Sequence, residues 1–165
     1  MFELAVDAVV VKEEGIGQYS VLLHDIEGGT GWELPGGPVV EAEHDLDDGN
    51  AWLRLSCFHY ISEQTGIDPE AVEDNYYGMH QYQCLITSEE HKTLSVVYYC
   101  MVDEDQHDEV DKQLKNKCGN ARFFPIQVSL NSDGTLQIEG LPKLKYDYHE
   151  EAVAAVMQHF TKKEN

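Results

Sequence analysis

Positive charge is scarce in this sequence. Its 165 residues contain 31 aspartates and glutamates against 11 lysines and arginines, which gives a formal net charge of −20. Only Arg54 and Arg122 are arginines. Such a chain repels nucleic acid and anionic membranes, so we expect neither as a partner. It also has few groups that clamp phosphates, and an anionic substrate would therefore need positive charge from metal ions or helix N-termini.

Paired cysteines and long apolar runs are also absent. The four cysteines, Cys57, Cys84, Cys100 and Cys118, form no C-x-x-C pair, which disfavours a zinc site or a redox dithiol and favours reduced thiols. The N-terminal apolar run is far shorter than a membrane span and has no basic head like that of a signal peptide. We therefore expect a cytoplasmic protein.

What the sequence does contain is enough apolar material for one folded unit. Hydrophobic residues make up 42% of the chain, which argues against disorder. The length suits one domain with its own core, and neither an internal repeat nor an interdomain linker is visible. We predict a single domain over residues 1–165.

The first half of the chain is predicted to contain two strands and a helix. Residues 2–12 and 18–26 are rich in β-branched and apolar side chains and flank a turn at residues 14–17. Residues 41–50 are acidic and lack hydrophobic periodicity, which predicts an exposed loop. A helix is predicted from Asn50, a suitable N-cap, to the residue before Gly66, where glycine ends a helix.

The apolar side chains of this helix recur at helical spacing. They predict one buried face, with Phe58 beside it: Leu53, Cys57, Tyr60 and Ile61. Residues i, i+3 and i+4 share a helical face, so Tyr60, Glu63 and Gln64 are also expected to lie together. That face is either an ordinary solvated surface or a metal site reduced to one acid.

The second half is predicted to be mostly strands. Residues 76–86 and 93–103 should form an antiparallel hairpin, and residues 122–130 and 135–141 flank the turn sequence NSDG. Residues 103–120 are predicted to be a polar excursion without an element of their own.

A last helix is predicted from the capping box of Asp147 and Glu150. Its predicted buried stripe comprises Val153, Val156, Met157 and Phe160. The order of elements predicts an α/β fold in which a mixed sheet lies between helices, an α/β/α sandwich.

The segment WELPGG, residues 32–37, is the most informative motif. Taken alone it is a rigid turn, but it follows a strand pair and precedes a helix that ends in ISEQTGI, residues 61–67. In this arrangement the sequence resembles the Nudix hydrolase family. Gly37 and Glu43 match the start of that family's motif, and the end is matched by Ile61, Glu63, Gly66 and Ile67. The segments RFFPI and LPKLKYDYHEEAV are similar to its C-terminal part.

The sequence departs from the family motif within the helix. Fifteen residues, 44–58, stand where the family has seven, and His59 replaces the motif arginine. Tyr60 and Gln64 replace the first and last helix glutamates, so that only Glu63 of three remains. An amide oxygen is a weaker ligand than a carboxylate, and a phenol with a pKa near ~10 cannot serve as one.

The resemblance implies a site for a divalent cation, Mg²⁺ or Mn²⁺, and a substrate. It implies metal ligation by Glu63, the Gly37 carbonyl and Glu43, with weak binding expected because two acids are missing. It implies catalytic positions at Glu63, Gln64 and Tyr60. It implies substrate contacts at Trp32, Glu33, Gly36, Glu104 and Glu109. The alternative for the loop acids, Glu104 and Glu109 included, is that they belong to the general acidic surface.

Two functions stay open at this point. One is metal-dependent hydrolysis of a nucleoside diphosphate linked to another group, which the retained motif favours. The other is binding of a nucleotide or ADP-ribose-like ligand without hydrolysis, which the missing glutamates favour. An interaction module that uses only the scaffold is a weaker third. The expected partner is a small-molecule nucleoside diphosphate derivative, with a homodimer as a further possibility.

Overall fold

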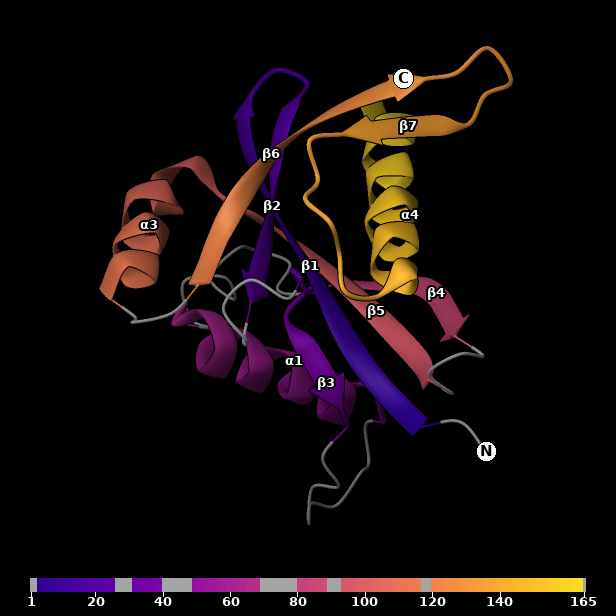
Figure 1. Cartoon of the computed structure of the whole chain (residues 1–165). Coiled ribbons are helices and arrows are strands. Elements are labelled where there is room, and N and C mark those ends of the chain that lie inside the picture. The colour runs from indigo at the N-terminus through magenta and orange to yellow at the C-terminus, as the bar shows by residue number, and fades with distance from the viewer. Residues whose placement is uncertain are drawn as a thin grey trace.

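The computed structural model describes residues 3–25, 31–39, 49–68, 80–88, 93–116 and 120–164. The N-terminal half contains β1 (Glu3–Gly15), β2 (Gln18–Asp25), β3 (Gly36–Pro38) and α1 (Gly49–Thr65). The remainder contains β4 (His80–Ser88), β5 (Thr93–Val102), η1 (Glu104–Gln106), α3 (His107–Asn116), β6 (Asn120–Leu130), β7 (Leu136–Glu139) and α4 (Asp147–Glu164). The sheet runs through the middle of the molecule, with α1 and α4 on opposite sides (Figure 1).

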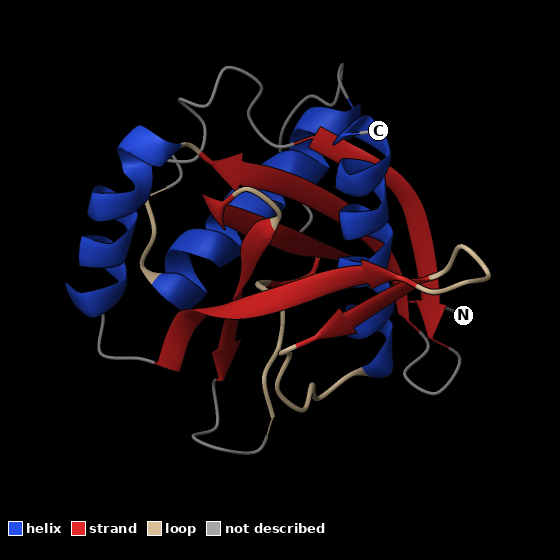
Figure 2. Cartoon of the chain, turned by 90° about the horizontal axis from the view of Figure 1, so that it is seen from above, coloured by secondary structure: helices blue, strands red, loops and turns tan. Residues whose placement is uncertain are grey.

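Strand β1 is the centre of the sheet. The strand order is β4-β5-β1-β2-β6-β7, and β3 pairs with β1 outside this path. β1 is parallel to β5 and antiparallel to β2 and β3, which confirms the predicted mixed sheet. One edge of β1 is divided: its start pairs with β3, and its end pairs with β2. β2 continues onto β6, and the strands curve across the molecule between helices (Figure 2).

The alternation of side chains along β1 builds both halves of the core. Val6, Ala8 and Val10 pack in one cluster with α1, while Val9 and Val11 pack in another with α4. This follows from the period of two in a strand, which sends successive side chains to opposite faces. Residues 4–11 of β1 are apolar apart from Asp7, because helices cover both faces of the strand.

Both predicted helices are present, with the predicted buried faces. Cys57 and Ile61 of α1 are fully buried, and Leu53 is partly buried against the same cluster. In α4 the residues Val153, Val156 and Met157 are fully buried, with Phe160 packed beside them. Gly66 follows α1 with φ 82°, the left-handed conformation expected after a helix. Within the described part of the chain, no helix is both long and apolar enough to cross a membrane.

Three elements were missed by the sequence analysis. Residues 103–120 are not a plain polar excursion, since they include η1 and α3. α3 buries little besides Val110, with Leu114 partly buried one turn later, so its apolar stripe is too narrow to stand out. The Gly36–Pro38 part of the predicted turn is a short strand. Of the predicted loop at 41–50, residues 49 and 50 begin α1, and the rest lies outside the described residues.

Candidate functional site

The site is organised around β3, which lies against the start of β1. Asp7 pairs with Gly36, and Val6 pairs with Gly37, in antiparallel register. The Ala8 N–H donates to the Pro35 carbonyl at 2.8 Å. A β-carbon at Gly36 would overlap the Val6 carbonyl oxygen and would approach the Asp7 carboxylate. The approach of these strands therefore requires glycine at position 36.

Helix α1 holds β3 from the other side through two polar side chains. The Gln64 Nε2 donates to the Gly36 carbonyl at 2.9 Å, and Gln64 Oε1 accepts the Gly36 N–H at 2.9 Å. The amide thus satisfies both backbone groups of one residue, as a neighbouring strand would. The Tyr60 hydroxyl donates to the Pro38 carbonyl at 2.5 Å. We call these three hydrogen bonds the clamp.

The clamp depends on neutral side chains at both positions. A carboxylate at position 64 would have no proton to give to the Gly36 carbonyl. Burial, followed by the nearby Glu63 and Glu3, raises the pKa of the Tyr60 phenol, which therefore stays protonated and remains a donor. A β-carbon at Gly37 would lie 2.7 Å from Tyr60 Cζ, so glycine is also what admits the tyrosine ring.

Glu63 does not join Tyr60 and Gln64 in this arrangement. Its Oε2 lies 2.7 Å from His59 Nε2, one helical turn earlier, and both side chains are more than 60% exposed. Glu63 is also not among the described residues that line the cavity beside the clamp. Among the residues that the structure describes, no group of three or more His, Cys, Asp or Glu side chains could hold a metal ion.

A cavity of about 430 Å³ lies beside the clamp. Its described lining comes from the start of β1, the segment around β3, α1, Thr93 and the residues that begin α4. The lining residues are Glu3, Ala5, Asp7, Glu33, Leu34, Gly36, Gly37, Pro38, Tyr60, Gln64, Thr93, Tyr146, Tyr148 and His149. The structure thus brings five predicted positions together here: Glu33, Gly36, Gly37, Tyr60 and Gln64.

Other predicted positions lie elsewhere. Trp32 packs edge-on against Phe124, with ring centroids 4.7 Å apart, and belongs to the core cluster on the α4 side. Glu109 is exposed and accepts a hydrogen bond from Gln113 at 3.2 Å. Glu43 lies outside the described residues.

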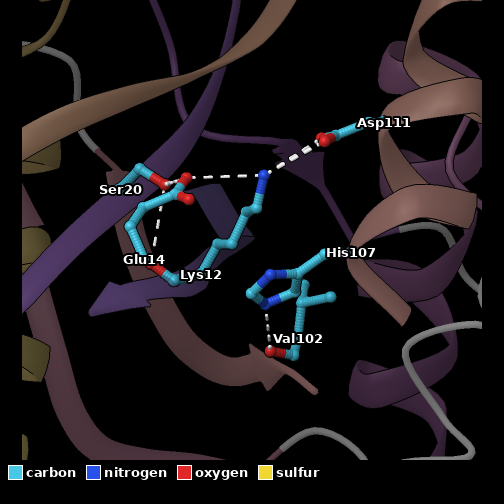
Figure 3. Close-up of polar contacts among 6 residues, drawn as sticks. All are labelled: Lys12, Glu14, Ser20, Val102, His107 and Asp111. Atoms are coloured by element: carbon cyan, nitrogen blue, oxygen red, sulfur yellow. Dashed lines mark hydrogen bonds and ion pairs between the residues drawn. The ribbon is translucent and has the colours of Figure 1, made fainter. Parts of the chain in front are cut away.

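Glu104 lines a separate cavity at the far end of β1, about 370 Å³ in volume. There Lys12 Nζ lies 3.2 Å from both carboxylate oxygens of Asp111 and 3.4 Å from Glu14 Oε1 (Figure 3). The ion pair joins β1 to α3. His107 Nε2 lies 3.3 Å from the Val102 carbonyl oxygen (Figure 3). Glu14 of this cavity therefore lies beside a buried lysine, although neither cavity has a lysine or arginine among its described lining residues.

The sequence analysis missed the buried polar groups of the first cavity. Asp7 is 3% exposed and accepts a short hydrogen bond from the Ser95 hydroxyl. His149 is 2% exposed, and its Nδ1 accepts the Leu34 N–H at 3.2 Å. Its Nε2 lies 3.1 Å from Asp7 Oδ1 but outside hydrogen-bonding geometry. One signal in the sequence could have revealed this group: Asp7 lies within an otherwise apolar stretch of β1.

The backbone places Tyr146, directly before α4, and Tyr148, in its first turn. The Lys145 N–H donates to the Trp32 carbonyl at 3.0 Å, and the Trp32 N–H donates to the Lys143 carbonyl at 3.2 Å. These bonds tie residues 143–145 to the segment before β3. Tyr146 and Tyr148 then follow at the cavity, with ring centroids 5.4 Å apart.

No protein-family model and no curated protein sequence matches the chain. Solved structures do match. One is Shewanella oneidensis NrtR, with 18% identity and a TM-score of 0.62 over 97% of this chain and 63% of that one. Another is the NUDIX domain of Shewanella oneidensis NrtR complexed with ADP ribose, with 17% identity and a TM-score of 0.54 over 97% and 89%.

A third match is a MutT/nudix family protein from Enterococcus faecalis, with 16% identity, a TM-score of 0.56 and coverage of 99% of this chain and 64% of that one. The chain spans less than two thirds of the first and third of these proteins. The matches extend over nearly all of this chain at low identity, and they agree on one architecture. The chain has the fold of the Nudix hydrolases.

Proposed function

We propose that the chain binds a nucleoside diphosphate derivative of the ADP-ribose kind in the cavity beside the clamp, and that it does not hydrolyse this ligand by a metal-dependent route. The observation that carries the proposal is the clamp itself. Tyr60 and Gln64 stand where the resemblance places metal-binding glutamates, and both hold the backbone of β3.

The donor atoms do not fit a divalent cation. Mg²⁺ takes oxygen ligands in a near-octahedral set, usually including carboxylates. Gln64 Oε1 already accepts the Gly36 N–H, and the Tyr60 hydroxyl is a donor to Pro38. Glu63 pairs with His59 on the exposed surface. Binding of Mg²⁺ or Mn²⁺ at this face of α1 would require breaking the hydrogen bonds of the clamp. The intact clamp therefore disfavours a metal-dependent reaction here.

The binding half of the proposal rests on the cavity and on one comparison. Small-molecule sites are concave and typically measure about 300–1,000 Å³, a range that includes this cavity. The NUDIX domain of Shewanella oneidensis NrtR, which has the same fold, was solved as a complex with ADP ribose. These two facts support an ADP-ribose-like ligand as the first to test.

The test measures binding and turnover in the same samples. The melting temperature and calorimetric titration with ADP-ribose would be recorded with Mg²⁺, with Mn²⁺ and with a chelator. Chromatography would follow the appearance of AMP. We expect binding that is insensitive to metal, and no AMP. Metal-dependent AMP formation by the wild type would overturn the proposal and would favour the alternative, a metal-dependent hydrolase.

Variants sharpen this test. The double variant Tyr60→Glu, Gln64→Glu restores two carboxylates but breaks the clamp, so we expect tighter Mg²⁺ binding together with a lower melting temperature. Glu104→Gln, in the far cavity, is the matched control and should behave as wild type. Metal binding by the wild type equal to that of the double variant would contradict the role assigned to the clamp.

A further inference from the structure

The cavity beside the clamp has an unusual balance of charge for a nucleotide site. Its described lining includes the carboxylates of Glu3, Asp7 and Glu33, and no lysine or arginine. The first turn of α4 adds the acids Asp147 and Glu150, which offset the partial positive charge of the helix N-terminus. A phosphate inside this cavity would therefore meet carboxylates and no cation among the described lining residues.

Two tyrosines form an aromatic wall beside these carboxylates. The rings of Tyr146 and Tyr148 stack at an interplanar angle of 29°. Lys145 Nζ lies 5.5 Å from the centre of the Tyr146 ring, so this ring already holds one cation from the chain itself. The pKa of the Tyr148 phenol is raised, mainly by burial and then by the charges of Asp7, Tyr146, Glu33 and Glu3. The lining carboxylates therefore act electrostatically on this tyrosine.

His149 does not supply the missing positive charge. Its Nδ1 accepts the Leu34 N–H, so that nitrogen carries no proton and the ring is neutral. The proton of the neutral ring is then on Nε2, which is buried and has no hydrogen-bond partner. It faces the Asp7 carboxylate at 3.1 Å, so the neutral ring accompanies a buried acid and adds no positive charge to the cavity.

We propose that this cavity takes the base and ribose of its ligand, prefers a positively charged base, and leaves any phosphate outside. The stacked tyrosines provide the face on which a heteroaromatic cation binds most strongly. The carboxylates accept hydrogen bonds from ribose hydroxyls and exocyclic amines, and they compensate the charge of the base. The inference rests on the proposed function, since it specifies which part of a nucleotide occupies the same cavity.

Calorimetric titration with four adenine ligands tests the inference. Adenosine and 1-methyladenosine have nearly the same shape, but at neutral pH the methylated base is cationic. We expect 1-methyladenosine to bind roughly 2- to 30-fold more tightly than adenosine, the range of a cation–π contact. AMP, which adds only a phosphate, should bind more weakly than adenosine. ADP-ribose completes the set.

Two variants locate the preference. Glu33→Gln removes one lining carboxylate, and Tyr146→Leu removes part of the aromatic wall. Each should reduce the preference for 1-methyladenosine over adenosine, while Glu104→Gln in the far cavity should leave it unchanged. Circular dichroism and the melting temperature would show that each variant is folded. Two different positions are used so that misfolding of one still leaves a test.

The outcomes separate the inference from the proposed function. If ADP-ribose binds but adenosine and 1-methyladenosine bind equally, the inference fails and the proposed function stands. If 1-methyladenosine is preferred and ADP-ribose does not bind, the inference stands and the proposed function fails. If AMP binds more tightly than adenosine, the phosphate lies inside the cavity and the inference is wrong.

Discussion

The two ends of β1 each line an acidic cavity, but their acids are in different surroundings. At the start of the strand, Asp7 is almost fully buried between Ser95 and His149. At the other end, Glu14 and Asp111 flank the ammonium group of Lys12. Neither cavity has a lysine or arginine among its described lining residues, but Glu14 of the second cavity pairs with Lys12, which joins β1 to α3 (Figure 3).

This difference shows that acidity alone does not identify a site in a chain of net charge −20. Near the far cavity, the Lys12–Asp111 ion pair joins β1 to α3, which is a structural role. The near cavity combines acids with an aromatic wall, two closely approached glycines and a buried histidine beside Asp7. The combination, rather than the carboxylates, distinguishes the candidate site.

The largest expected effect follows removal of Asp7. Asp7→Ala leaves the Ser95 hydroxyl and the His149 ring buried without their shared partner, and each buried polar group left unpaired costs about 1–3 kcal/mol. At the far end, Asp111→Ala leaves Lys12 with Glu14 at 3.4 Å, so we expect a loss of about 1 kcal/mol. Urea unfolding measures both. Equal losses would remove the distinction between the two ends.

The second largest effect on stability is expected at glycines. Gly36 lies beside the start of β1, and Gly15 is its last residue. Gly36→Ala drives a β-carbon into the Val6 carbonyl, and we expect a loss of about 1–3 kcal/mol from overpacking. Gly15→Ala places its β-carbon no closer than 3.4 Å to Gln18, and it should be nearly neutral. The melting temperatures of the two variants measure this difference. A tolerated Gly36→Ala would mean that β3 can move away from β1.

The sequence predicted the large elements well because their signals are local. β1 and α4 carry dense apolar patterns, and the turn at NSDG joins two strands as expected. α3 was missed because its apolar stripe consists of little more than Val110 and Leu114 in an otherwise polar segment. β3 was missed because three residues are too few for a periodic pattern.

The candidate site was predicted only where it coincides with a motif. Gly36, Gly37, Tyr60 and Gln64 came from the motif and lie together at the cavity. Asp7 and His149 did not, since they are 142 positions apart, and nothing local shows that the fold brings them within 3.1 Å. The shared face predicted for Tyr60, Glu63 and Gln64 divides in the structure, because Glu63 pairs with His59 while the other two hold β3.

A smaller effect concerns the clamp. Tyr60→Phe removes the hydrogen bond to Pro38, and Gln64→Leu removes both bonds to Gly36. Each should cost about 0.5–1.5 kcal/mol, with Gln64→Leu at the upper end because two backbone groups lose their partner. The measurement is chemical unfolding, with Lys112→Gln on the exposed surface of α3 as the control. A stable double variant would show that β3 holds its place without α1.

The smallest expected effect is the most discriminating one. Glu63 and His59 are both mostly exposed, and surface pairs at i, i+4 contribute little to stability, so Glu63→Gln should change the free energy of unfolding by no more than about 0.5 kcal/mol. Ligand affinity should also stay unchanged, because Glu63 lies outside the described cavity lining. If Glu63 were instead the remaining metal ligand, the same substitution would abolish Mg²⁺ binding and any turnover. Parallel titrations of wild type and Glu63→Gln with ADP-ribose and with Mg²⁺ separate these cases, since a metal-dependent loss of affinity in the variant would return this carboxylate to the site and contradict the neutral clamp.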